Sequence, residues 1–200
     1  MIQEVIIGID NGFSGALVAL DVPSRSIVDM RRMPVASCPW RGNTVDVCAL
    51  TAWLRSFRRV RYVVFEECPE HAGKASIMRS MGYVFGQVCA AVQFAGLENR
   101  LRFVRSGNPG DSWQRALFHG WNATIAGQTK ELARKLAARH WPRESWIPPG
   151  CRTPDRGLID AALIALFAIL YHRRGDTLPL VCPPPKNPKK KKTRKSTPSQ

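Results

Sequence analysis

The stretch that decides the fold is MIQEVIIGIDNGFSGA, residues 1–16, in which a short apolar run ends at Asp10. A β-branched run of this length, bounded by Asn and Gly, predicts a buried central strand at residues 5–9. A carboxylate at the end of such a strand costs free energy unless a metal or a basic neighbour pairs with it. Two glycines allow a tight turn into a second apolar run at residues 16–20, which predicts a hairpin. Taken alone, Asp10 is better explained as the start of the turn, so its interpretation depends on the other carboxylates.

Alternating strands and helices follow the hairpin, which is typical of an α/β fold. Hydrophobic periodicity predicts strands at 26–35, 62–68 and 100–105, and helices at 45–57, 76–96, 113–117, 130–141 and 156–173. Helix caps are predicted at Thr44, at Asp111 or Ser112, and at Thr129. We expect residues 36–44 to form a loop. Gly82 and Gly86 lie four residues apart, which favours tight packing of their helix on the sheet over a binding role.

Acidic residues end two of the predicted strands. The 62–68 strand, YVVFEEC, carries Glu66 and Glu67 at the point where Asp10 follows the first strand. Strands joined through a helix are parallel neighbours, so their carboxyl ends form one edge of the sheet. Ligand sites of open α/β sheets lie at such edges. Side chains alternate along a strand, so only one of Glu66 and Glu67 faces the site.

Two further carboxylates occur at the last predicted helix, 156–173. Asp160 enters an apolar surface and needs a partner for its charge, and Asp155 lies just before the helix. Five residues is not a same-face spacing, but a loop residue and a helix residue can converge on one point. Together with Asp10 and Glu66 they predict a Mg²⁺ site. A pair of such ions stabilises the attacking and leaving oxygens of an in-line phosphoryl displacement.

The chain of 200 residues is strongly basic, with a formal net charge of +15. Residues 186–200 hold seven of the 30 Lys and Arg residues and no acidic one, so the rest of the chain still carries +8. This charge indicates a polyanionic partner. Nucleic acid is favoured over membrane because no basic amphipathic helix with an aromatic face accompanies the charge. We expect one domain at 1–178 and a disordered Pro- and Lys-rich tail at 179–200.

Neither a membrane span, nor a secretory leader, nor a zinc site is predicted. The longest apolar run, residues 161–170, has the length of a buried helix. The sequence starts directly in a strand, without a basic and apolar leader. The six cysteines are widely spaced and form no CxxC pair, which indicates a reducing compartment.

Four segments carry a resemblance to a known family. They are GIDNGFSGA at 8–16, VVFEE at 63–67, the glycine-bearing helix 76–96, and DRGLIDAALIA at 155–165. Their order and spacing resemble the RuvC-type Holliday junction resolvases of the ribonuclease H-like superfamily, with the bacteriophage and chloroplast members nearest in style. The resemblance spans residues 4–172. It implies an α/β fold with a ribonuclease H-like mixed five-stranded sheet flanked by helices.

The resemblance also implies an activity and a set of site residues. The activity is that of a Mg²⁺-dependent endodeoxyribonuclease, with Mn²⁺ able to substitute, which cuts a four-way DNA junction symmetrically as a homodimer. Asp10, Glu66 and Asp160 take the positions of the first, second and last acids. Asp155 takes that of the fourth ligand, where some members have His. The alignment of the VVFEE motif favours Glu66 over Glu67.

A second match concerns the residues that would hold DNA. SGNPGDSWQRAL followed by GQTKELARKLA, residues 106–117 and 126–136, is similar to phage-type members in which a lysine leads a helix. This implies that Lys130 stabilises charge near the scissile phosphate, and a solvated lysine is the simpler alternative. Candidate DNA contacts are Lys74, Arg79, Arg102, Arg105, Arg115 and Lys130. In the family the 76–96 helix contributes to the dimer interface, and bulky residues near its start (Met78, Met81, Tyr83, Val84, Phe85) fit that interface and the core equally well.

Three alternatives stay open. The acids fit a related nuclease acting on RNA–DNA hybrids or flaps, and the fold fits an inactive architectural DNA-binding protein. The DNGFSGA segment also resembles actin-like kinases, but that fold needs two such halves. Retention of all four acids favours an active enzyme, because unpaired acids cost stability. We expect a cytoplasmic, nucleoid-associated protein, with a nuclear or organellar location open because the basic tail also resembles an import signal.

Overall fold

The computed structural model describes most of the chain and leaves out six segments. These are residues 1–2, 41, 68–74, 105–112, 119–127 and 174–200. Several predictions lie outside the described residues. They concern Lys74, Arg105, the cap at Asp111 or Ser112, and the tail 179–200.

Five strands form the predicted mixed sheet, in the order β3-β2-β1-β6-β7. The strands are β1 (Val5–Ile9), β2 (Ala16–Asp21), β3 (Ile27–Arg32), β6 (Val60–Glu66) and β7 (Leu101–Val104). β1, β2 and β3 form an antiparallel meander. β6 is parallel to β1, and β7 is parallel to β6, so β1 and β6 end at the same edge of the sheet.

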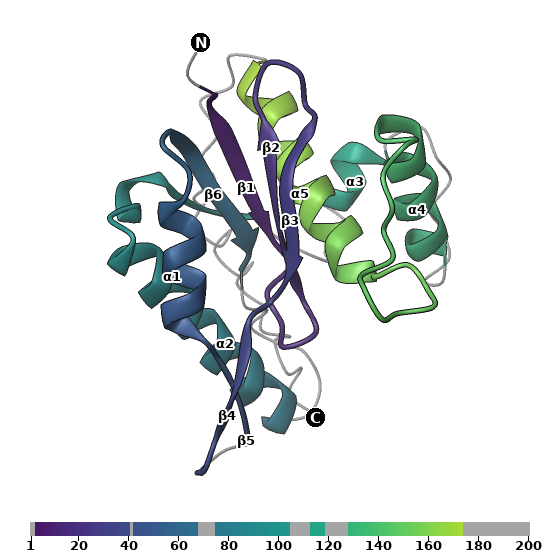
Figure 1. Ribbon diagram of the computed structural model, residues 1–200. Helices are drawn as coiled ribbons and strands as arrows, with labels where there is room; N and C mark the ends of the chain where they lie inside the picture. The colour runs from purple at the N-terminus through teal and green to yellow at the C-terminus, as the bar shows by residue number, and fades with distance from the viewer. Residues whose placement is uncertain (1–2, 41, 68–74, 105–112, 119–127, 174–200) are drawn as a thin grey trace, which may run out of the picture.

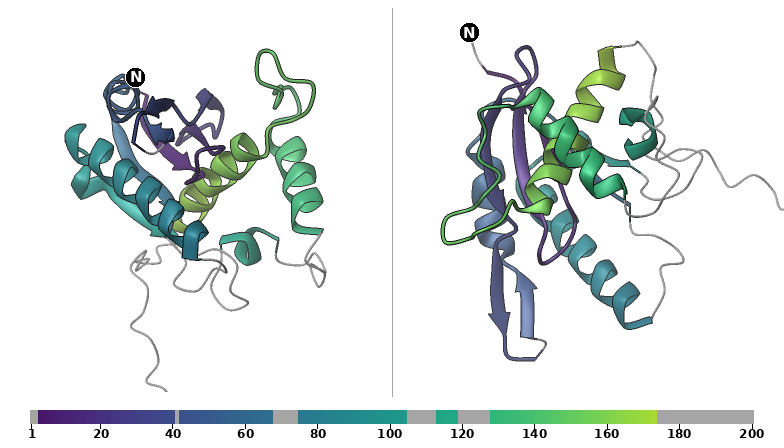
Figure 2. Two further views of the ribbon diagram at one scale, coloured as in Figure 1. Left: turned by 90° about the horizontal axis from the view of Figure 1, so that it is seen from below. Right: turned by 90° about the vertical axis from the view of Figure 1, so that its right-hand side faces the viewer.

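Helices cover both faces of this sheet (Figures 1 and 2). The helices are α1 (Val47–Arg55), α2 (Ala75–Phe94), α3 (Trp113–Leu117), α4 (Gln128–His140) and α5 (Arg156–Arg173), with a 3₁₀ turn at Glu98–Arg100. Alternate residues of β1 separate two cores: Ile7 packs with α1 and α2, and Ile6 packs with α5. None of the helices in the described part of the chain is long and apolar enough to span a bilayer.

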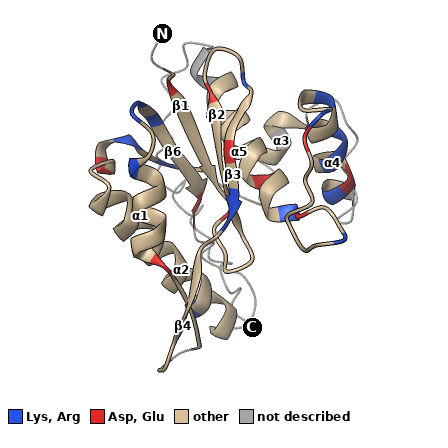
Figure 3. Cartoon of the chain, in the orientation of Figure 1, with Lys and Arg blue, Asp and Glu red and all other residues tan. Residues whose placement is uncertain are grey.

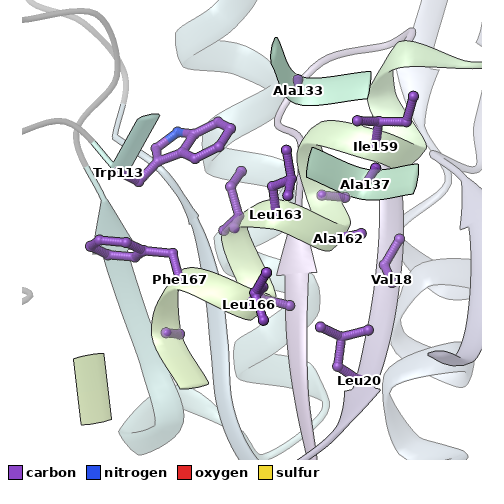
Figure 4. Packing of buried hydrophobic residues seen from close by; sticks show 14 of the residues in the cluster. Val18, Leu20, Trp113, Ala133, Ala137, Ile159, Ala162, Leu163, Leu166 and Phe167 are labelled. Carbon is purple, nitrogen blue, oxygen red and sulfur yellow. The ribbon is translucent and has the colours of Figure 1, made fainter. Parts of the chain in front are cut away.

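Helix α5 is buried between the sheet and α4. Figure 4 shows its side chains packed against Val18 and Leu20 of β2 and against Ala133 and Ala137 of α4. The backbone of α5 meets β1 at Gly8, where a Cβ atom would lie only 2.0 Å from the carbonyl oxygen of Ala161. Only glycine allows this approach. It brings the start of α5 against the end of β1.

The predicted loop at 36–44 is wrong. Residues in this segment form a hairpin of β4 (Val35–Cys38) and β5 (Gly42–Val45), which projects beside α2 in Figure 1. The sequence lacks the apolar alternation of a half-buried strand because most of the hairpin is exposed. Gly42 has a φ of +80°, which suits the turn. The hairpin is held on α2 by Gln87, which accepts a hydrogen bond from the N–H of Val45 at 3.1 Å.

Two predicted helix caps are also wrong. Asp46, not Thr44, caps α1 by accepting a hydrogen bond from the N–H of Ala49 at 2.9 Å. The Thr44 hydroxyl instead accepts one from Gln87 at 2.5 Å. Thr129 lies inside α4, which begins one residue earlier. Both errors are shifts of one or two residues, where several polar residues compete for one cap.

The predicted packing of Gly82 and Gly86 on the sheet is wrong as well. No atom lies within 4 Å of a Cβ built at either glycine, and both residues are exposed. The buried face of α2 is instead Val84, Val88, Ala91 and Val92, with Phe85 packed against Phe65. Two of the bulky residues near the helix start therefore belong to the core of the subunit.

Candidate active site

Three of the predicted carboxylates line one cavity of about 410 Å³ at the shared edge of β1 and β6. Asp10 directly follows β1, Glu66 is the last residue of β6, and Asp160 lies in the second turn of α5. The remaining lining residues are Ser14, Gln114, Arg156 and Gly157. The convergence follows from parallel β1 and β6 and from the close approach of α5 to β1.

The start of α5 packs on the turn of the β1–β2 hairpin. A Cβ at Gly157 would lie 3.0 Å from the carbonyl oxygen of Ser14 and 3.1 Å from the backbone of Gly15. A larger residue would therefore push α5 away from the hairpin. This contact and the one at Gly8 set the position of Asp160 relative to Asp10.

Burial and nearby charges shift the pKa values of the carboxylates in this cavity. The pKa of Asp10 rises from 3.8 to about 7, first because the group is buried and then because Asp160 and Glu66 carry like charges nearby. Burial also raises the pKa of Asp160, while Arg156 lowers it. Near neutral pH the group of acids therefore favours binding a proton or a cation.

The structure distinguishes the two glutamates at the end of β6. Glu66 lines the cavity, and its Oε1 accepts a hydrogen bond of 2.6 Å from the indole N–H of Trp113, which is buried. Glu67 lies just beyond the strand and is exposed, and it is not among the residues that line the cavity. Trp113 thus holds Glu66 toward the site, a partnership that the sequence analysis did not predict.

Asp155 is placed differently from the other three acids. Its Oδ2 accepts a hydrogen bond of 2.6 Å from Nε of Arg32 at the end of β3. Its Oδ1 accepts one of 3.3 Å from the N–H of Leu158, as a residue that caps α5 does. The side chain is buried and does not line the cavity. In this conformation Asp155 ties the start of α5 to β3.

Arg156 is a cavity residue that the sequence analysis missed. Its Nε donates a hydrogen bond of 3.2 Å to Oδ2 of Asp160, four residues further along α5. The Arg156 side chain is 54% exposed and that of Asp160 is 14% exposed. The signal was present in DRGLID, because residues four apart face each other on a helix.

The predicted DNA contacts are scattered over the described structure. Lys130 is exposed in the first turn of α4, and Arg79 is exposed on α2. Arg115 lies on α3, and its side chain is outside the described residues. Arg102 lies 4.8 Å from the ring centre of Tyr62, so it covers an aromatic face of its own subunit. Lys130, Arg79 and Arg102 are not among the residues that line the cavity.

The cavity offers oxygen donors of the type that Mg²⁺ prefers. Within the described segments, no three His, Cys, Asp or Glu side chains are close enough together to hold a metal as they stand. Burial and the like charges of Asp160 and Glu66 nevertheless raise the pKa of Asp10, and a divalent cation would stabilise these carboxylates in their charged form. The donor set therefore fits a hard divalent cation, once its side chains draw together.

Comparison with known proteins is informative about the fold. No protein-family model matches the sequence, and no curated protein matches it. Among solved structures, T. thermophilus RuvC in complex with a Holliday junction substrate is similar in fold, with a TM-score of 0.51 and 18% sequence identity. The match covers 86% of this chain and 97% of that one. It confirms the predicted ribonuclease H-like fold of the RuvC type, while the bacteriophage or chloroplast branch stays a prediction.

Proposed function

We propose that the protein is a Mg²⁺-dependent endodeoxyribonuclease that resolves four-way DNA junctions by paired, symmetric cuts. The observation that carries this proposal is the convergence of Asp10, Glu66 and Asp160 on one cavity, in a fold similar to that of RuvC. Oxygen donors at the carboxyl ends of parallel strands are suited to phosphoryl transfer, where catalysis consists mainly of positioning and charge stabilisation.

Asp10, Glu66 and Asp160 would hold the cation, with two ions per site and Mn²⁺ as a possible substitute. Asp155 is a candidate fourth ligand, which would require it to release Arg32. A divalent cation in this cavity supplies Lewis-acid stabilisation of charge on the reacting phosphate.

The other residues of the site orient the acids. Trp113 donates a hydrogen bond to Oε1 of Glu66, which fixes the orientation of that carboxylate at the end of β6. The Arg32–Asp155 pair and the hydrogen bond from the N–H of Leu158 to Asp155 hold the first turn of α5, one turn before Asp160. Holding these elements in place reduces the ordering that the acids still need when the substrate arrives.

The charge of the chain supports binding to DNA. Figure 3 shows basic residues on α4, at the end of β3 and at the start of α5. In α4 they are Lys130, Arg134, Lys135 and Arg139. Lys130 is proposed to approach the scissile phosphate, and Lys74, Arg79, Arg105 and Arg115 to contact the DNA backbone. The tail 179–200 would add salt-sensitive affinity, and the enzyme would act with the nucleoid.

A homodimer is proposed because a symmetric junction needs two active sites. The exposed face of α2 supports it. Arg79, Gly82 and Gly86 lie on that face, and the space beside both glycines is open. Two helices that meet through small residues pack closely, so this face suits a second copy of the chain.

The test is cleavage of three labelled substrates by the purified full chain: a four-way junction, a flap and an RNA–DNA hybrid, each with Mg²⁺. The proposal expects paired nicks at symmetric positions of the junction, lost with EDTA and in Asp10→Asn. Glu144→Gln is a matched control, because this exposed carboxylate lies away from the cavity. Cleavage of the hybrid or flap alone would assign the related nuclease activity. Tight junction binding without Mg²⁺-dependent cleavage would assign an architectural protein.

A further inference from the structure

Arg156 places a positive charge in the cavity where a metal cation would bind. It lines the same cavity as Asp10, Glu66 and Asp160, and its Nε contacts Oδ2 of Asp160 at 3.2 Å. A guanidinium has five donors and no acceptor, so Arg156 cannot ligate a cation. While it is bonded to Asp160, it occupies an oxygen that a cation would need.

Without the nearby acids, the positive charge of Arg156 would be electrostatically unfavourable at the start of α5. Arg156 is the first residue of α5, where the helix dipole disfavours a positive charge. The nearby acids offset this cost, since Arg156 lowers the pKa of both Asp10 and Asp160. Arg156 is thus held in place by the carboxylates of the cavity.

The Arg156 side chain also reaches solvent. It is 54% exposed, whereas its partner Asp160 is only 14% exposed, so the guanidinium stands at the mouth of the cavity. A phosphate entering the cavity would meet this group first. The planar fork of arginine binds a phosphate through two hydrogen bonds, which a lysine does not match.

We propose that Arg156 is the internal counter-ion of the carboxylates and that it exchanges Asp160 for the substrate phosphate when a divalent cation binds. With a divalent cation bound, Asp160 would serve as a ligand, and the guanidinium of Arg156 would be released to hold the phosphate. Cation and DNA therefore bind cooperatively, each raising the affinity for the other by the same factor. The inference rests on the proposed function, and it adds a residue that couples the binding of cation and phosphate.

The experiment measures two affinities of the full chain. Mn²⁺ binding without DNA is followed by electron paramagnetic resonance of the free ion. Binding of a fluorescent four-way junction is followed by anisotropy with Ca²⁺, with intact DNA verified on a gel. The variants are Arg156→Gln, Arg156→Lys, Asp10→Asn and the control Arg152→Gln, an exposed arginine four residues earlier that does not line the cavity.

The two affinities of Arg156→Gln are expected to change in opposite directions. Mn²⁺ should bind about fivefold more tightly, the upper range for losing a competing exposed ion pair. The junction should bind about tenfold more weakly, because a charged hydrogen bond to phosphate is lost. Arg156→Lys should keep a Mn²⁺ affinity near that of the wild type and an intermediate junction affinity. Arg152→Gln should leave Mn²⁺ affinity unchanged and weaken junction binding by less than Arg156→Gln.

Other outcomes overturn the inference in distinguishable ways. If Arg156→Gln weakens both affinities, Arg156 has a structural role at the start of α5. If the wild type binds Mn²⁺ through Asp10 and Arg156→Gln binds it no more tightly, the counter-ion role alone fails. If the wild type and Asp10→Asn bind Mn²⁺ equally, or if neither binds it, Asp10 does not hold the cation and the proposed function fails as well.

Discussion

The buried carboxylate Asp10 should make the native protein less stable as the pH rises, and Asp10→Asn should remove this effect. In the folded protein the pKa of Asp10 is about 7, against an ordinary value of 3.8. The native state therefore keeps a proton between these two pH values where the unfolded chain has lost it. The stability that this proton contributes is complete below pH 3.8 and is lost as the pH rises through about 7.

The size of the effect follows from the same two values. At about 1.4 kcal/mol for each tenfold change in a protonation equilibrium, the interval corresponds to a maximum of about 4 kcal/mol. Asp10 remains open to the cavity, so water and counter-ions relieve part of this cost. We expect Asp10→Asn to be about 2–4 kcal/mol more stable than the wild type at pH 8 and nearly equal to it at pH 4.

Urea unfolding followed by tryptophan fluorescence measures this difference across the pH range. Glu144→Gln, which changes an exposed carboxylate, should show no such trend. Addition of Mg²⁺ at pH 8 should stabilise the wild type and not Asp10→Asn, because a ligand of the native state alone raises stability. An Asp10→Asn protein that is less stable than the wild type at pH 8 would refute the reasoning.

Four further substitutions test the packing around the site and on the open face of α2. Gly8→Ala should destabilise the fold by about 3 kcal/mol or more, because the new Cβ would meet the backbone of α5. Gly82→Ala should instead stabilise α2 by about 0.5–1 kcal/mol, because the space beside Gly82 is open. Urea unfolding measures both differences. Trp113→Phe removes the hydrogen bond to Glu66 and should cost about 1–2 kcal/mol of stability together with part of the Mg²⁺ response in the same assay. Asp155→Asn should lower the free energy of unfolding by about 1–2 kcal/mol and still bind Mn²⁺ in electron paramagnetic resonance titrations. If Asp155→Asn loses Mn²⁺ binding as completely as Asp10→Asn does, Asp155 is instead a ligand.

The sequence was sufficient for the sheet and for three of the acids. Period-two and continuous apolar runs mark β1, β2 and β6, because these strands are buried and their side chains are selected by burial. A carboxylate next to such a run is conspicuous, which singled out Asp10 and Glu66. The exposed hairpin β4–β5 carries no such pattern, since solvent accepts almost any residue at its positions.

Only the tertiary structure decided how the polar side chains around the acids are paired. The Arg32–Asp155 bond joins residues far apart in the chain, and so does the bond from Trp113 to Glu66. Such contacts depend on how α5 and α3 pack on the sheet, and for α5 the close approach at Gly8 constrains this packing. Local patterns determine which segments are buried, whereas the partner of a buried charge is determined by the three-dimensional packing of segments distant in sequence.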